Sequence, residues 1–329
     1  MKARLFLTIS IAATMLWSCQ FDDVLSTPSN DGVIRVTSTL TKTESASGTT
    51  TNSSTTNDNF KRNEIIYVWA DKTGTTDGYI KAWQLTATDT NGNFRGDSKA
   101  WPYDGLSLDF HALHGNFTET ELDKKWSDLT SLTHTVLPDQ SSVEDRRKSD
   151  LLFAEKTGAT HGSNVGLSFR HLLAKITVKL DLRNSKGISN TELERAQVTL
   201  TNIQPEATFK SSAGAVASAG GDHTTIKAGI ISSSINSGDV IGSAIVPLQS
   251  FGNNDNSNII QIALSDGRIF SYTPDATNLE KSMEYTYTLK IINGELSVSD
   301  IRVNELDSTT ADKSWDIYVE SEDDGPNVD

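Results

Sequence analysis

The chain has 329 residues, a formal net charge of −14 at pH 7, 36% hydrophobic residues and one cysteine. This length allows two domains with a core in each, and the composition is that of a globular chain rather than a disordered or membrane-embedded one. A chain this acidic lacks the excess of Lys and Arg that nucleic acids and anionic bilayers attract, so we expect neither as a charge-driven partner.

The first eighteen residues predict a secretory leader. Lys2 and Arg4 precede an apolar run at residues 5–16, which is too short to span a bilayer as a helix but suits a signal peptide. The context Leu16-Trp17-Ser18-Cys19 resembles a bacterial lipobox. We therefore predict a lipoprotein signal peptide at 1–18 and acylation of Cys19, whose lipid would anchor the chain. An ordinary secretory signal is the alternative.

Two polar stretches follow the leader. We expect residues 19–32 to form a tether and residues 43–59, almost entirely Thr, Ser, Asn and Gly, to form a mobile loop.

Most of the remaining sequence alternates between apolar and polar residues with period 2, which is typical of strands. The alternation is clearest at 174–182, where one face is expected to be buried and the other wet. Asp266-Gly267 predicts a hairpin turn. Residues 118–129 are the best helical candidate, because Thr118 and Glu121 form a capping-box pattern. Further strands are expected at 33–40, 64–70, 194–200, 259–264, 268–272, 285–291, 295–303 and 315–320.

The regular succession of strands and polar turns predicts an all-β chain built from two antiparallel β-sandwich domains. Residues 155–166 (EKTGATHGSNVG) are the best candidate linker. The expected division is a domain at 33–163 and a domain at 164–329.

Motifs of catalysis or metal binding are not evident in the sequence. It contains no Gly-rich phosphate loop, H-E-x-x-H, G-x-S-x-G or C-x-x-C. His111 and His114 are three apart on an expected strand, which places them on opposite faces. We therefore predict no catalytic residue, no cofactor and no metal site, and a protein that is not an enzyme. A surface hydrolase with an Asp/Glu pair drawn from distant loops stays open as a further class.

Several blocks, taken in order, carry a resemblance to a known family. They are a lipobox, a Thr/Ser-rich stretch, and then NEIIYVWA (63–70), WP (101–102) with LSLDFHA (106–112), DLLFA (150–154) and VGLSFRHLLAKI (165–176). In this order they resemble the fimbrillin family of Bacteroidales. The last block, with the pattern V-x-L-x-F-x-H-x-L-A-K-I, is the most specific.

The resemblance implies two transthyretin-like β-sandwich domains, export as a lipoprotein, and display on the outer membrane as a subunit of a surface fimbria (pilus) with a role in adhesion. It also implies that a trypsin-like protease cuts after a basic residue near the N-terminus, and that a strand from the next subunit replaces the strand that is lost. The implied partners are other copies of the chain or related fimbrial subunits, and the outer membrane through the lipid.

The candidate processing residues are, in order of preference, Lys42, Arg35 and Arg62. An uncut chain that keeps its lipid is the alternative. Asp22 and Asp23 lie soon after Cys19 and resemble a signal for transfer to the outer leaflet.

The candidate donor strand alternates Trp315, Ile317 and Val319 with polar neighbours, as a strand that fills an apolar slot must. Alternatively, this segment is the last strand of its own domain. The alternative function is a surface lipoprotein that binds glycan or a host protein without polymerising, for which the six tryptophans offer aromatic surfaces.

Overall fold

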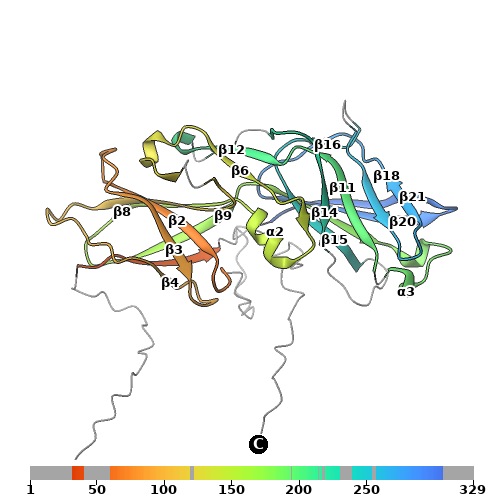
Figure 1. The fold of residues 1–329 in the computed structure, drawn as a ribbon, viewed down its shortest axis with the longest axis horizontal. Coiled ribbons are helices and arrows are strands. Elements are labelled where there is room, and N and C mark those ends of the chain that lie inside the picture. The colour runs from red at the N-terminus through yellow and green to blue at the C-terminus, as the bar shows by residue number, and fades with distance from the viewer. Residues whose placement is uncertain are drawn as a thin grey trace, which may run out of the picture.

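The computed structural model describes residues 32–40, 60–118, 122–193, 195–213, 215–216, 219–229, 239–253 and 257–306. Strands dominate these residues, and the expected all-β class is confirmed (Figure 1). No helix within these ranges is long and apolar enough to cross a membrane.

A seven-stranded sheet forms one end of the molecule (Figure 1). Its spatial order is β1-β9-β8-β5-β2-β3-β4, and only the β1–β9 pair is parallel. The bounds are Arg35–Leu40 for β1, Ile65–Lys72 for β2, Ile80–Ala87 for β3, Phe94–Arg95 for β4, Leu108–His114 for β5, Leu152–Ala159 for β8 and Asn164–His171 for β9.

Four further sheets form the other end. Their orders are β15-β10-β20-β21, β18-β17-β11-β14-β7, β13-β12-β6 and β16-β19. The bounds are Leu132–Thr135 (β6), Asp139–Gln140 (β7), Ala174–Leu180 (β10), Gln197–Ile203 (β11), Glu206–Lys210 (β12), Ala215–Val216 (β13), Thr224–Ala228 (β14), Asp239–Val246 (β15), Ser250–Phe251 (β16), Ile260–Ala263 (β17), Ile269–Tyr272 (β18), Thr277–Asn278 (β19), Met283–Ile292 (β20) and Glu295–Glu305 (β21).

Parallel pairs make these sheets mixed rather than purely antiparallel as expected. β1 runs parallel to β9, β10 to β20, and β7 to β14. Each parallel pair joins strands far apart in the chain, so local alternation carries no signal of it.

The stretch expected to be a linker lies between two strands of one sheet. Residues 155–166 contain the end of β8, a polar turn and the start of β9. β8 and β9 pair antiparallel within the seven-stranded sheet, so this polar stretch is a hairpin turn. The chain passes to another sheet at residues 172–173, and we propose that position, rather than 164, as the boundary.

Two apolar clusters fill the interior. One lies on a single face of the seven-stranded sheet, and the other extends from the opposite face of that sheet through the four further sheets. Trp126, Phe153 of β8 and Phe209 of β12 join the two ends, with ring centroids 5.7–5.9 Å apart. This shared aromatic cluster couples the two ends through direct packing.

β10 is a strand as expected, but the prediction of a wet face is wrong. Lys175 is only 1% exposed, and its Nζ lies 3.1 Å from a carboxylate oxygen of the fully buried Glu284 on β20. The Thr177 hydroxyl donates to the same carboxylate at 2.6 Å. Lys175 and Thr177 are polar although buried because the carboxylate of Glu284, rather than water, satisfies them.

The hairpin expectation is confirmed. β17 and β18 pair antiparallel with Ile260 opposite Tyr272, and Gly267 adopts a φ of +92° in the turn. Only glycine adopts such a φ without strain.

Of the expected helix at 118–129, the described part is helical only at Leu122, and residues 119–121 lie outside the described residues. Trp126–Asp128 then form a 3₁₀ turn, so an α-helix does not continue to residue 129. The main helix is instead α2 (Val143–Ser149), which lies between the two ends of the molecule (Figure 1). A second helix, α3, covers Asn190–Leu193.

Candidate functional site

Strand β1 closes the seven-stranded sheet. One edge pairs with β9 over six residues, from Arg35 opposite Asn164 to Leu40 opposite Phe169. The other edge meets residues 92–101: the Ile34 amide donates to the Lys99 carbonyl at 2.8 Å, and the Ser38 amide donates to the Gly92 carbonyl at 2.9 Å. Without β1, both flanking segments would present unpaired backbone groups, which is the situation that strand addition relieves.

The side chains of β1, and of Ile34 directly before it, alternate between core and surface. Ile34, Val36 and Ser38 are 3%, 7% and 3% exposed, whereas Thr39 is exposed and its hydroxyl lies 3.3 Å from the hydroxyl of Ser168. The buried side chains of Ile34 and Val36 contribute about 3–6 kcal/mol as an upper estimate. This contribution is large enough to hold the strand and small enough for a comparable strand to replace it.

The structure separates the candidate processing residues. Arg35 lies half-buried within β1, whereas Arg62 is exposed in a turn after the fully buried Phe60. Lys42 lies two residues beyond the end of β1 and outside the described residues, as do Cys19, Asp22, Asp23 and the candidate donor strand with Trp315, Ile317 and Val319.

Helix α2 begins with a side-chain N-cap. The Ser142 hydroxyl accepts from the Asp145 amide at 3.0 Å and donates to the Asp145 carboxylate at 2.6 Å. On the helix, Arg146 is buried and donates to the Gln140 carbonyl at 2.9 Å. The Gln140 amide in turn donates to the Ile245 carbonyl at 2.9 Å and accepts from the Ile245 amide at 2.8 Å. The start of α2 is thereby fixed to β15.

The end of α2 is fixed to the seven-stranded sheet. The Arg147 guanidinium donates to both carboxylate oxygens of Glu64, at 2.5 and 2.8 Å. Burial raises the pKa of Glu64, but the bonds from Arg147 outweigh it and hold the pKa below its usual value. The His114 ring nitrogens lie 2.7 Å from the Ile65 carbonyl oxygen and 3.1 Å from the Arg147 carbonyl oxygen. The helix therefore ties the two ends of the molecule together.

Two of the family-like sequence blocks meet at this junction. Asp150, which ends α2, accepts from His171, which ends β9, at 2.6 Å. Burial raises the pKa of Asp150, but the nearby His171 outweighs it and the pKa is lowered. The blocks at 150–154 and 165–176 thus build one polar contact where the chain leaves the seven-stranded sheet.

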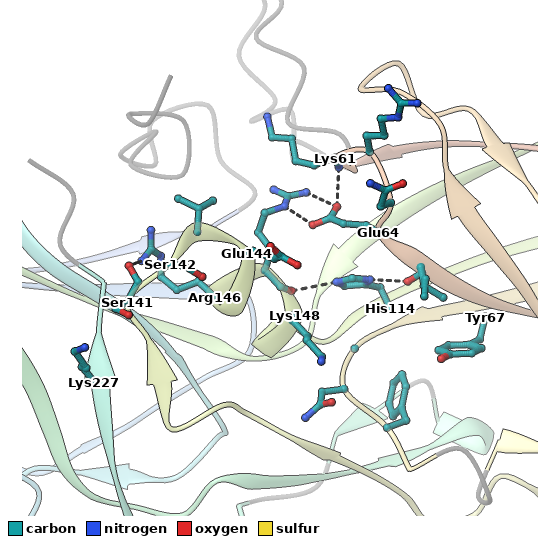
Figure 2. A pocket seen from close by; sticks show the side chains of 18 of the residues that line it. Lys61, Glu64, Tyr67, His114, Ser141, Ser142, Glu144, Arg146, Lys148 and Lys227 are labelled. Carbon is teal, nitrogen blue, oxygen red and sulfur yellow. Dashed lines mark hydrogen bonds and ion pairs between the residues drawn. The ribbon is translucent and has the colours of Figure 1, made fainter. Parts of the chain in front are cut away.

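A groove of about 1100 Å³ opens beside α2, lined by residues 61–65, 114–117, 141–144 and 146–148 together with Tyr67, Gln197 and Lys227; we call it the junction groove (Figure 2). Its walls carry two glutamates, Glu64 and Glu144, against six cations: Lys61, Arg62, Arg146, Arg147, Lys148 and Lys227. A positive groove is notable on a chain of net charge −14.

Three of these six cations have neither an ion pair nor a side-chain hydrogen bond among the described residues. Arg147 pairs with Glu64, Lys227 lies 3.5 Å from Asp139, and Arg146 donates to backbone carbonyls. No ion pair is found among the described residues for Lys61, Arg62 or Lys148, which line the groove at its start and along α2. Local sequence does not reveal this cluster, because residues 61–62 and 146–148 meet only in the fold.

Other candidate sites receive little support. No group of three His, Cys, Asp or Glu side chains within the described ranges could hold a metal ion. His111 stacks on Trp126 with ring centroids 4.4 Å apart, and burial lowers its pKa, so it does not join His114. The four tryptophans in the described part of the chain, Trp69, Trp83, Trp101 and Trp126, are all buried and offer no exposed aromatic platform.

The fold and the site define a class: an all-β protein of several packed sheets, with a short strand at the edge of its largest sheet and a polar helix that joins its two ends. Comparisons with known proteins place this all-β fold in a family. The fimbrillin-like family model matches residues 49–310, and the chain belongs to this family. No curated protein matches the chain.

Two solved structures share the fold at low sequence identity, and a third is reported with them as similar. A protein of Bacteroides uniformis classed with cell adhesion has a TM-score of 0.58 at 16% identity, covering 84% of this chain and 99% of its own. A similarly classed protein of Bacteroides ovatus has a TM-score of 0.58 at 16% identity, covering 83% and 97%. The tip fimbrial protein Mfa3 of Porphyromonas gingivalis has a TM-score of 0.49 at 8% identity, covering 83% and 99%.

Proposed function

We propose that this chain is a structural subunit of a bacterial surface fimbria, exported as a lipoprotein through Cys19 and assembled by strand exchange. In this proposal a protease removes β1, and a strand from the next subunit, carrying Trp315, Ile317 and Val319, takes its place. Membership of the fimbrillin-like family supports the coarser statement, a structural rather than catalytic role in a surface appendage.

The position of β1 is the observation that carries the proposal. It is a short strand with both edges hydrogen-bonded and only a few buried side chains. The ends of the segment that follows, Leu40 and Phe60, both lie near Phe169: Leu40 is its strand partner, and the rings of Phe60 and Phe169 are 4.9 Å apart. A cut in residues 41–59 would release β1 without breaking another strand of the sheet.

This geometry favours Lys42 as the processing residue. A protease needs an accessible backbone, and the backbone at Arg35 is engaged in the β1–β9 ladder. A cut after Arg62 would release Phe60, which is fully buried and packs on Phe94, His114 and Phe169. A cut after Lys42 leaves this core residue in place.

The test is proteolysis of the folded chain followed by N-terminal sequencing and detergent electrophoresis. We expect a new N-terminus at Thr43 and a ladder of multimers that resists detergent, both abolished by Lys42→Gln. A chain that starts only at acylated Cys19 on the cell surface, or that stays monomeric after the cut, would contradict the proposal. That second outcome would favour a non-polymerising lipoprotein that binds glycan or a host protein.

Delivery to the cell surface is a separate part of the proposal. We assign the outward signal to Asp22 and Asp23, so Asp22→Ala with Asp23→Ala should leave the protein lipidated and facing inward. Antibody labelling of intact cells measures this, and unchanged labelling would remove the assignment.

A further inference from the structure

We propose that the junction groove binds the acidic segment at residues 320–324 of a second copy of the chain. This inference rests on the proposed strand exchange and adds an electrostatic contact to it. Residues 320–324 read Glu-Ser-Glu-Asp-Asp and follow Val319 directly. The bound segment is thus the continuation of the incoming strand, and the groove provides positive charges for its acidic side chains.

The direction of β1 leads an incoming strand toward the groove. β1 runs parallel to β9 and ends at Leu40, opposite Phe169, on the side of the sheet that faces α2 (Figure 1). A strand that takes the same place and direction, with Val319 where Leu40 now lies, leaves the sheet at this point.

The groove begins within reach of that exit. The Phe60 ring contacts Phe169 at 4.9 Å on one side and His114 at 5.3 Å on the other. His114 and Lys61, the residue after Phe60, both line the groove (Figure 2). Five extended residues span about 16 Å, which is enough to pass this aromatic layer and enter the groove.

The charges are complementary. Four of the five residues at 320–324 are acidic, and Lys61, Arg62 and Lys148 are groove cations for which no ion pair is found among the described residues. Because the groove is open to solvent, these contacts are screened by salt and each adds little alone. Together they favour one direction of the incoming strand, since the reverse direction would carry the acidic segment away from α2.

The proposed contact also limits where the protease can cut the chain. Lys61 and Arg62 stay in the groove only if the cut lies before them, so a groove that receives the acidic segment is compatible with cleavage at Lys42 and not with cleavage at Arg62. This is the same choice that the burial of Phe60 favours.

The experiment uses the full chain, cut within residues 41–59 through an inserted protease site, and a fluorescent peptide covering residues 313–326. Exchange of the peptide for β1 is followed by anisotropy and by mass spectrometry of the released fragment. The peptide is compared with one carrying Glu320→Gln, Glu322→Gln, Asp323→Asn and Asp324→Asn. The cut chain is compared with its Lys61→Gln/Arg62→Gln/Lys148→Gln variant and with a matched control, Lys81→Gln/Lys210→Gln/Lys281→Gln, which removes three exposed cations elsewhere.

We expect the neutral peptide and the groove variant each to bind about tenfold more weakly at low salt, with little further loss when the two are combined. The control variant should bind the peptide as the parent does, and the differences in affinity should vanish at about 1 M salt.

The other outcomes overturn the inference in distinguishable ways. Equal binding of both peptides to the cut chain would leave strand exchange standing and remove the groove contact. Equal losses in the groove and control variants would show general charge attraction. If binding of a heparin oligosaccharide required the three groove cations and binding of the acidic peptide did not, the groove would be assigned to an anionic glycan. Failure of both peptides to displace β1 would overturn the inference together with the proposed function.

Discussion

Strands β1 and β10 both run parallel to a neighbour, yet the structure holds them very differently. β10 lies inside its sheet, paired with β15 on one side and β20 on the other, and buries an ion pair. β1 has one continuous ladder, with β9, and only isolated bridges at Val33 and Thr37 on its other edge. How firmly a strand is held therefore depends on its neighbours as well as on its own sequence pattern.

The largest expected effect is on β10, the strand that is paired on both sides. Lys175→Ala leaves the carboxylate of Glu284 buried without its cation, which should lower the free energy of unfolding by about 3–5 kcal/mol. Denaturant unfolding measures the change.

A double variant supplies the control for that loss. Lys175→Met with Glu284→Leu removes both charges and should recover most of the stability. A double variant as unstable as Lys175→Ala would show that packing, rather than the unpaired charge, causes the loss.

The next effect is a dependence of stability on pH. Burial lowers the pKa of His134 to about 4. Its Nδ1 accepts from the Asn116 amide at 3.0 Å and its Nε2 lies 2.9 Å from the Ser149 carbonyl oxygen, so the ring is neutral. Below about pH 6.5 the unfolded chain binds a proton at His134 whereas the folded chain does not, so the stabilisation from the neutral ring is fully present above pH 6.5. The free energy of unfolding should fall by about 3 kcal/mol as the pH drops toward 4.

Substitution at His134 isolates this contribution. His134→Gln keeps an acceptor and a donor but does not titrate, so its stability should change less between pH 6.5 and 4. Exposed His161→Gln is the matched control and should behave as the parent. Parallel pH curves for the parent and His134→Gln would contradict the assignment.

A third prediction concerns β1, the strand that we propose is released. Val36→Ala removes buried methyl groups from β1 at a cost of about 2 kcal/mol, which should speed hydrogen exchange of β1 amides by about 30-fold. Amides of β10 should not change, because β1 opens without the rest of the fold.

A matched substitution in β10 tests whether local opening is confined to β1. Val178→Ala in β10 should accelerate exchange across the molecule, because β10 opens only in global unfolding. If Val36→Ala also accelerated β10, the two strands would belong to one cooperative unit and β1 would not be separately releasable.

The smallest effect concerns the helix that joins the two ends. Ser142→Ala removes the cap of α2 and should cost about 1 kcal/mol in denaturant unfolding. Ser142→Asp retains a capping oxygen and should cost much less. An equal loss in both variants would show that the cap is not responsible.

Local patterns predicted the elements better than their partners. Alternation identified β10, and Asp266-Gly267 identified the β17–β18 hairpin, because both signals lie within a few residues. The sequence did not reveal that Lys175 and Thr177 are buried, since Glu284 reaches them from β20, more than a hundred residues away. The stretch at 155–166 resembled a linker because a polar hairpin turn has the same composition.

The site was predictable only in part. Alternating residues and their place before a polar loop indicated β1, whereas processing was implied by the resemblance to fimbrillins, and the basic residues around β1 supplied only its candidate positions. Helix α2 was missed because polar residues, Arg146 and Ser149, form its buried face and leave no apolar periodicity. The junction groove could not be anticipated, because it forms only when residues 61–65 and α2 meet.

Intermolecular disulfide trapping is the measurement that tests replacement of β1 most directly. Thr39 and Ser168 have hydroxyls 3.3 Å apart on the exposed face, and Tyr318 takes the place of Thr39 when Val319 replaces Leu40. A chain that starts at residue 20, and so lacks the single native cysteine, would carry Ser168→Cys with Tyr318→Cys. The account predicts disulfide-linked multimers only after the cut, and none when Ile317→Cys replaces Tyr318→Cys. Cut chains that keep residues 35–40 bound and form no intermolecular disulfide would contradict it.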